Sequence, residues 1–184
     1  MILIFSAPSG SGKSTLVQHL LDTRQDMELS ISATTRAPRG KEQDGKEYYF
    51  ISRERFEDLI KQDAFVEWEQ VYQGTYYGTL RSEIERIENA GHHVVFDIDV
   101  KGGINIKHLF GDRARAIFIA PPSLEILRER LTNRGTDSKE KIEERLAKAE
   151  IELADAPLFD TILVNDDLSA TKQALDKEIA AFIG

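Results

Sequence analysis

The chain has 184 residues and a formal net charge of −8, from 24 Lys and Arg against 32 Asp and Glu. A hydrophobic share of 41% with 30% charged residues is typical of a globular chain and excludes intrinsic disorder. The sequence contains no cysteine, which excludes disulfides and thiolate metal sites. Its acidity argues against nucleic acid as a partner, and no stretch approaches the roughly 18 apolar residues of a membrane helix. We therefore expect a soluble, cytoplasmic protein without an obligate protein partner, although a homo-oligomer is compatible with the sequence.

Short apolar runs alternate with helical patterns along most of the chain, which predicts an α/β fold with a parallel sheet flanked by helices. Strands are expected at 2–6, 94–99, 116–120 and 161–164, each with both faces covered. Helices are expected at 14–22, 80–90, 124–133, 139–154 and 170–182. Ser123 suits the N-cap of the third helix, and Gly91 and Gly135 suit positions just beyond helix ends.

Residues 31 to 79 have a different composition, with polar and aromatic residues, several glycines and one short helix expected at 53–62. This pattern indicates a small mixed α/β lobe inserted into a single domain. The polar segment 133–141 between two helices predicts a mobile lid. We therefore expect a core at 1–31, 80–122 and 156–184, an inserted lobe at 32–79, and a helical lid with its adjoining helices at 123–155.

The first expected strand runs into a glycine-rich loop and then a helix, which is the context of a phosphate-binding loop. Glycines let backbone N–H groups converge on phosphate oxygens, and the helix N-terminus adds partial positive charge. Lys13 would reach the β- and γ-phosphates, and the Ser14 hydroxyl would ligate Mg²⁺. The candidate ATP-binding residues of the loop are Ala7, Pro8, Ser9, Gly10, Ser11, Gly12, Lys13, Ser14 and Thr15.

Ala7 stands where the usual pattern of this loop has its first glycine. A positive φ at that position would cost alanine about 1–2 kcal/mol. We expect ordinary dihedrals at the strand end instead, where alanine is tolerated. The alternative interpretation, a turn rich in glycine and serine with an incidental lysine, fits the flanking strand and helix less well.

Further segments, taken in order and spacing, resemble the guanylate kinase family: SATTRAPR at 32–39, GKEYYF at 45–50, EW at 67–68, YYG at 76–78, DIDVKG at 97–102, RGT at 134–136 and VNDD at 164–167. The resemblance covers essentially the whole chain. It implies a P-loop core, a GMP-binding lobe and an ATP lid that closes. It also implies transfer of a phosphoryl group from ATP to GMP with Mg²⁺.

The resemblance further implies individual site residues. The GMP phosphate would be held by Arg36, Arg39, Tyr48 and Tyr77, and the base would face Ser32, Glu67, Thr79 and Asp99. Arg130, Arg134 and Arg145 take the places of arginines that contact the transferring phosphates, and Asn165 lies on the ATP side. The candidate catalytic residues are then Lys13, Arg36, Arg134, Arg145 and Asp97. The candidate metal ligands are Ser14 and Asp97.

Residue chemistry supports these assignments unequally. Arg36 and Arg39 lie in one loop near several tyrosines, which favours a phosphate site over a solvated basic loop. Glu67 alone reads as a surface acid, but a carboxylate can accept both N–H groups of guanine, and the resemblance favours that role. Asp97 and Asp99, on one strand face at its carboxyl end, favour a site over simple strand-end caps.

Arg130 and Arg134 share a helix face, yet neighbouring glutamates leave an exposed amphipathic helix as the alternative. The four histidines show no metal-ligand spacing. Two other functions stay open: a P-loop kinase with another phosphorylated acceptor, and a non-catalytic interaction module. The module has no need for Gly12, Lys13 and Ser14, which this chain keeps.

Overall fold

The computed structural model describes residues 1–72 and 74–184. These residues form two compact units: the first contains residues 1–25 and 95–184, and the second contains residues 26–94. The second unit therefore extends beyond the 32–79 segment, because it also includes strand β2 (Met27–Leu29) and helix α3 (Arg81–Asn89). No helix within the described ranges combines the length and apolarity needed to cross a bilayer.

The larger sheet has five strands in the order β2-β7-β1-β8-β9, and β1, β8 and β9 belong to the first unit. Strand β1 (Ile2–Ser6) pairs in parallel with β8 (Ala114–Ala120), which pairs in parallel with β9 (Thr161–Val164). Strand β7 (His93–Asp97) begins in the second unit and ends in the first. At its start, the His93 N–H donates to the Asp26 carbonyl at 2.7 Å, next to β2. The predicted parallel sheet is confirmed.

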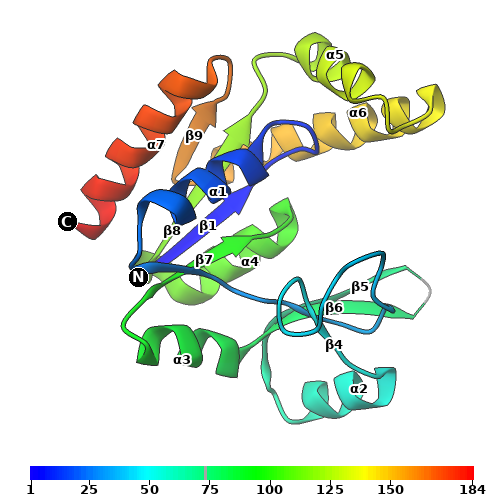
Figure 1. Ribbon diagram of the computed structural model, residues 1–184, viewed down its shortest axis with the longest axis vertical. Helices are drawn as coiled ribbons and strands as arrows, with labels where there is room; N and C mark the ends of the chain where they lie inside the picture. Colours follow the sequence, from blue (N-terminus) through cyan, green and yellow to red (C-terminus); the bar gives the residue numbers. More distant parts are fainter. Residues whose placement is uncertain (73) are drawn as a thin grey trace. The chain divides into compact units, whose positions relative to one another are not determined.

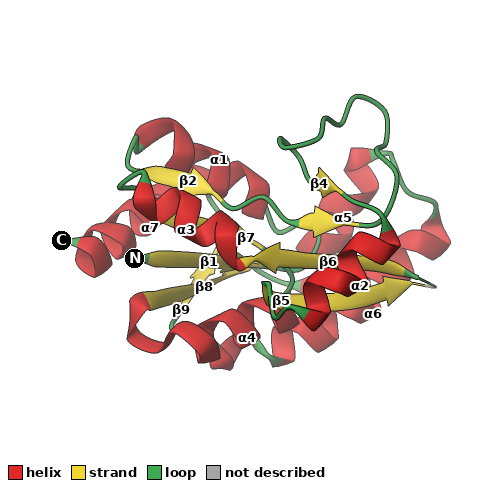
Figure 2. Cartoon of the chain, turned by 90° about the horizontal axis from the view of Figure 1, so that it is seen from below, coloured by secondary structure: helices red, strands yellow, loops and turns green. Residues whose placement is uncertain are grey.

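Helices cover both faces of this sheet. Helix α4 (Val100–Phe110) packs on β1 and β8, while α1 (Lys13–Thr23) and α7 (Leu168–Ile183) lie on the opposite face (Figure 2). Because both faces are covered, β1 is entirely buried and supplies the centre of the core. Helices α5 (Leu124–Arg134) and α6 (Lys139–Ala154) pack against each other through their own cluster of Leu127, Leu131, Ile142, Leu146 and Ala149 (Figure 1).

The chain after β7 corrects the sequence analysis. The predicted strand at 94–99 ends at Asp97, and Asp99 is instead the N-cap of α4, a helix that was not predicted. Two adjacent glycines weaken the helical pattern of α4, since glycine has low helix propensity. Packing requires them: a Cβ on Gly103 would lie 2.5 Å from the Ser6 hydroxyl, and one on Gly102 would lie 2.6 Å from Ile98. Asp97 and Asp99 consequently do not share a face of one strand.

Strand β9 gives a second correction. Its apolar run predicted a strand buried on both faces, but β9 is the edge strand, and Ile162 and Val164 are 46% and 54% exposed. Thr161 and Leu163, on the other face of the strand, are partly buried, while these two residues are exposed to solvent. The helix boundaries were predicted more accurately. The Ser123 hydroxyl accepts from the Ile126 N–H as an N-cap, and Gly91 and Gly135 have positive φ beyond α3 and α5, as expected.

The second unit contains a four-stranded sheet with the order β4-β3-β6-β5. Its strands are β3 (Ala33–Thr34), β4 (Tyr49–Phe50), β5 (Phe65–Tyr72) and β6 (Thr75–Leu80), with β5 and β6 antiparallel. Helix α2 (Arg53–Lys61) contributes Phe56, which stacks on Phe65 and Tyr76 with ring centroids 4.3 Å and 5.2 Å apart. These aromatic contacts form the small core of the unit.

Glu83 of α3 is a buried carboxylate that ties this unit together. It accepts the backbone N–H of Ile31 at 3.0 Å and the Tyr49 hydroxyl at 2.9 Å, and it pairs with Arg86. Burial by itself would raise the pKa of Glu83, but the hydrogen bonds from Arg86, Ile31 and Tyr49 outweigh it and lower that pKa. The charged form is therefore the native form of Glu83 at neutral pH.

Candidate active site

A cavity of about 590 Å³ opens in the first unit, between the loop that follows β1 and the helices α5 and α6. Its walls combine the glycine-rich loop, the end of β7 and the charged faces of both helices. The lining residues are Ala7, Pro8, Ser9, Gly10, Gly12, Lys13, Ser14, Thr15, Asp97, Ile98, Asp99, Arg130, Leu131, Arg134, Arg145, Lys148 and Glu152. The structure thus brings most of the candidate residues of this unit to one place.

The loop conformation depends on two glycines. Gly10 and Gly12 have φ values of 97° and 94°, and Gly12 is the N-cap of α1, so the first N–H groups of that helix lie at the cavity. A Cβ at Gly12 would also clash with the side-chain amide of Asn165. Ala7 is not among the residues of positive φ, which agrees with the ordinary dihedrals expected there. The departure from the usual loop pattern therefore causes no backbone strain.

Two candidate ATP-binding residues, Ser11 of the loop and Asn165, do not line the cavity. Ser11 is fully buried, and the Asn165 side-chain amide donates to the Ser11 carbonyl at 2.8 Å. Asn165 is itself 5% exposed. The side chain of Asn165 therefore supports the loop by donating to a loop carbonyl. The sequence analysis names both as ATP-binding candidates, Ser11 as part of the phosphate loop and Asn165 from the family resemblance.

Lys13 is held at the end of β7. Its ammonium group lies 2.5 Å from the Asp97 carboxylate and donates to the Ile98 carbonyl at 3.0 Å, and its side chain is 19% exposed. Asp99 faces the same cavity, but its carboxylate caps α4 by accepting the Gly102 N–H at 2.7 Å. The end of β7 therefore orients Lys13, whereas Asp99 stabilises the start of α4.

The candidate arginines of α5 and α6 all line the cavity. Arg130 donates to the Asn165 carbonyl at 2.8 Å, which joins α5 to the segment after β9. Arg145 donates to the Ser9 hydroxyl at 2.6 Å and lies 3.2 Å from Asp137, so it connects α6 to both the phosphate loop and the α5–α6 connection. With Arg134 they place a concentration of positive charge around the cavity of an acidic protein.

Sequence reasoning missed two charged residues of this cavity. Lys148 and Glu152 follow Arg145 on α6 at spacings that keep all three on one helix face, which was the available signal. Their side chains pair at 3.3 Å, and that of Glu152 is only 12% exposed. Burial raises the pKa of Glu152, with Asp99 adding to the rise, while Lys148 and Lys13 oppose it.

A second group of candidates gathers in the second unit around Arg36. The Arg36 guanidinium donates to the Tyr77 hydroxyl at 3.0 Å and lies over the Tyr48 ring, 5.0 Å from its centroid. The rings of Tyr48 and Tyr77 meet edge to face. Burial raises the pKa of Tyr48, so its hydroxyl keeps its proton and can donate to an anion. Arg39 lies in the exposed loop beside this group.

Glu67 and Thr79 form a pair across β5 and β6. They are register partners, and the fully buried Thr79 donates its hydroxyl to the Glu67 carboxylate at 2.9 Å. Ser32 lies directly before β3, and its carbonyl accepts the Tyr49 N–H. The contacts of the second unit thus bring Arg36, Tyr48 and Tyr77 together, and separately Glu67 and Thr79.

The cavity is lined by Lys13 at the start of α1, by the loop whose two glycines have positive φ, and by the arginines of α5 and α6. Together these features define a P-loop nucleotide kinase. Comparison with known proteins gives the particular family. The family model described as guanylate kinase matches residues 1–182, and the chain belongs to the guanylate kinase family.

Individual relatives agree with this assignment. A guanylate kinase of Porphyromonas gingivalis is 55% identical over 183 residues, which cover 99% of this chain and 97% of that protein. A guanylate kinase of Bacteroides fragilis is 50% identical, covering 100% of this chain and 90% of that protein. The crystal structure of guanylate kinase from Anaplasma phagocytophilum matches with a TM-score of 0.73 and 30% identity, over 98% of this chain and 85% of that one. The predicted fold class and the predicted class of enzyme are confirmed.

Proposed function

We propose that the protein transfers the γ-phosphoryl group of ATP to GMP, producing ADP and GDP. The observation that carries this proposal is the cavity of the first unit, where Lys13 and three arginines surround a loop of the phosphate-binding type. Relatives at 50–55% identity are called guanylate kinases. The choice of GMP as acceptor is supported by Glu67, whose carboxylate is oriented by a buried hydroxyl.

On the donor side, phosphoryl transfer requires positioning and charge neutralisation more than covalent chemistry. The N–H groups at the start of α1 hold phosphate oxygens, and Lys13 neutralises the β- and γ-phosphates. Arg134 and Arg145 stabilise the charge that develops on the transferring group. Arg130 and Asn165 hold the walls of the site, consistent with their contact at 2.8 Å.

Mg²⁺ is the cofactor that fits the available donors. No group of three or more His, Cys, Asp or Glu side chains in residues 1–72 and 74–184 could hold a metal by itself. Mg²⁺ usually takes one or two protein oxygens and completes its shell with substrate phosphates and water. The Ser14 hydroxyl and the Asp97 carboxylate, both lining the cavity, would hold it. When bound, the ion neutralises charge on the phosphate oxygens of ATP.

On the acceptor side, Arg36, Arg39, Tyr48 and Tyr77 hold the phosphate of GMP. Ser32, Glu67 and Asp99 face the base, and the buried Thr79 orients the Glu67 carboxylate. A carboxylate accepts the adjacent N1 and exocyclic N–H groups of guanine, whereas adenine has no such pair of donors. The phosphate oxygen is already a nucleophile, so this mechanism needs no strong general base. We accordingly propose 32–79 as the acceptor lobe, 123–155 as the lid with its helices, and the remaining ranges as the core.

The experiment that tests this proposal is a coupled ADP-release assay with ATP, Mg²⁺ and GMP, AMP, CMP or UMP in turn. We expect turnover with GMP and at least a hundredfold lower kcat/KM with the other three, because unpaired buried donors and acceptors strongly penalise the wrong base. Comparable rates with all four acceptors would favour a kinase of broader specificity. No turnover with any acceptor would favour the non-catalytic interaction module.

A further inference from the structure

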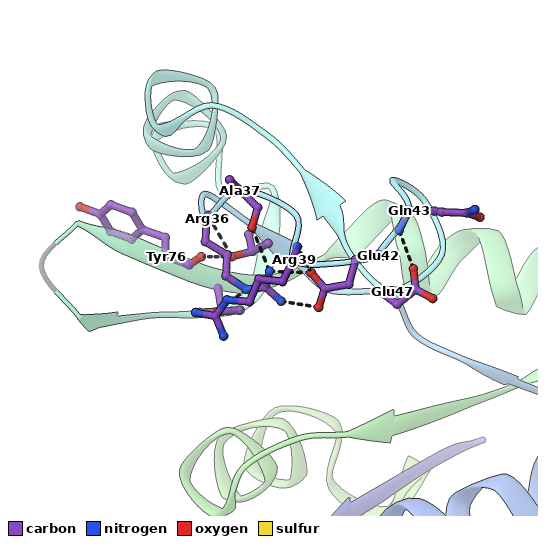
Figure 3. Close-up of polar contacts among 9 residues, drawn as sticks. Arg36, Ala37, Arg39, Glu42, Gln43, Glu47 and Tyr76 are labelled. Atoms are coloured by element: carbon purple, nitrogen blue, oxygen red, sulfur yellow. Dashed lines mark hydrogen bonds and ion pairs between the residues drawn. The ribbon is translucent and has the colours of Figure 1, made fainter. Parts of the chain in front are cut away.

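The guanidinium of Arg36 already has its donors engaged by the protein (Figure 3). Glu42 accepts from both terminal nitrogens, at 2.7 Å and 2.8 Å, in a bidentate pair. The Ala37 carbonyl accepts another N–H at 3.0 Å, and the Tyr77 hydroxyl accepts from Nε. An arginine has few donors beyond these, so Arg36 keeps little of its fork for a ligand.

The same carboxylate also fixes the backbone of Arg39. Oxygen Oε2 of Glu42 accepts the Arg39 N–H at 2.8 Å, and the Glu42 N–H donates to the Arg39 carbonyl at 3.1 Å. One glutamate therefore closes the loop between the two arginines and orients both of them (Figure 3). The pair is only partly exposed, with 12% of the Arg36 side chain and 23% of the Glu42 side chain open to solvent. Ion pairs of this bidentate form are among the more specific ones.

We propose that Glu42 is a positioning residue for the acceptor phosphate, holding Arg36 and the Arg39 backbone in the arrangement that receives the anion. This inference rests on the proposed function. In this arrangement Arg36 presents a fixed, partly occupied guanidinium together with the hydroxyl of Tyr77, and Arg39 supplies an exposed cation from a fixed backbone position. Ordering long side chains before binding lowers the entropic cost of binding.

A simple sum of charges predicts the opposite effect of Glu42. Arg36, Arg39 and Glu42 carry a net charge of about +1, and removal of the carboxylate raises it to about +2, which would attract a phosphate more strongly. If positioning dominates, removal weakens phosphate binding although the local charge becomes more favourable. The two physical effects therefore differ in sign, which makes the variant Glu42→Gln decisive.

The experiment is calorimetric binding of GMP and of guanosine to the full chain without ATP. Guanosine lacks the phosphate, so it reports on the base site and on the folding of the second unit. We expect Glu42→Gln to raise the Kd for GMP about tenfold, the usual effect of losing one charge-assisted contact, and to leave the Kd for guanosine unchanged. Glu42→Asp keeps the charge on a shorter side chain, so its Kd for GMP should fall between that of the unaltered protein and that of Glu42→Gln.

The matched control is Asp58→Asn, which removes one negative charge from an exposed pair with Lys61 in the same unit. We expect it to change neither Kd by more than about twofold, because exposed pairs contribute little. Unchanged or tighter GMP binding by Glu42→Gln would overturn the inference, as would an equal loss of guanosine binding. If the unaltered protein bound no GMP, the proposed function itself would fail.

Discussion

The buried hydroxyl of Thr79 donates a 2.9 Å hydrogen bond to the carboxylate of Glu67 across two paired strands. Because the two residues are register partners of β5 and β6, the sheet itself sets this contact, and the Glu67 side chain is restrained before any ligand arrives. A restrained carboxylate loses less entropy when it accepts the N–H groups of a base. Base selection in the proposed reaction would then depend on both residues.

Replacing Glu67 tests this dependence. We expect Glu67→Gln to raise KM for GMP roughly a hundredfold with KM for ATP unchanged, since an amide places a donor against a guanine donor. Steady-state kinetics with each substrate varied in turn measures both values. Thr79→Val removes the orienting hydroxyl and should raise KM for GMP less, by about tenfold. Thr79→Ser keeps the hydroxyl and is the control; equal changes in both KM values would argue against base recognition.

Replacing Lys13 tests the donor site. Lys13→Ala removes the cation that is placed by Asp97 and Ile98 at the cavity. We expect kcat to fall by at least about a thousandfold, because charge stabilisation by such a group acts in the transition state. Binding of GMP, measured separately by calorimetry, should not change. Circular dichroism verifies the fold, and a variant that retained near-normal kcat would contradict the mechanism.

The phosphate loop predicts a difference between two glycines. Gly12→Ala introduces both a positive-φ penalty and a clash with the Asn165 amide, whereas Gly91→Ala introduces the φ penalty alone, with open space around its Cβ. We expect Gly91→Ala to lower the free energy of unfolding by about 1 kcal/mol and Gly12→Ala by about 2 kcal/mol or more. Urea denaturation measures both. Equal losses would mean that Asn165 moves aside without cost.

The pair of Arg36 and Glu42 predicts a pH dependence. The hydrogen bonds from Arg36 and from the Arg39 backbone lower the pKa of Glu42 from 4.5 to about 2. Because the folded pKa is depressed, the stabilising contribution is complete above pH 4.5 and is lost as the pH falls toward 2. Denaturation of the unaltered protein and of Glu42→Gln across this range should give curves that converge at low pH. A constant difference would show that Glu42 does not titrate in this window.

Glu152 predicts a pH dependence of stability opposite in sign to that of Glu42. Burial in the cavity wall raises its pKa in the folded chain, so the folded state holds that proton more tightly than the unfolded chain. Stability therefore decreases as the pH rises from the ordinary glutamate pKa through the raised one. Without nucleotide, Glu152→Gln should be more stable than the unaltered protein at pH 7, with no such gain under acidic conditions. Thermal unfolding at both pH values measures this, and a less stable variant at pH 7 would refute it.

Local patterns predicted the parts of the molecule whose physics is local. The phosphate loop, the caps at Ser123 and Gly135, and four of the five strands of the larger sheet follow from residues close together in sequence. Helix α4 was missed because its two adjacent glycines weaken the helical pattern, and the close approach of Gly103 to Ser6 of β1 involves residues far apart in sequence. The exposed face of β9 was missed for a similar reason, since only the strand order makes it an edge.

The candidate site also combines features that the local sequence predicts with features that it does not. Loop residues and arginines could be identified by type and spacing, but their partners could not. That Glu42 occupies the Arg36 fork, and that Asn165 supports the loop, depends on distances between side chains. Acidic residues such as Glu42 and Glu152 are also abundant in this chain, so composition alone gives no reason to select them.

Ala7 has an ordinary φ, while Gly10 and Gly12 need the left-handed region. The glycine positions of this motif are therefore not equivalent. The backbone conformation requires glycine at positions 10 and 12, whereas position 7 also accepts alanine. A motif definition that insists on glycine at position 7 would reject this chain, although its loop is unstrained. A definition that weighted each position by its dihedral angles would accept it, and would also admit other chains with a small side chain at that strand end.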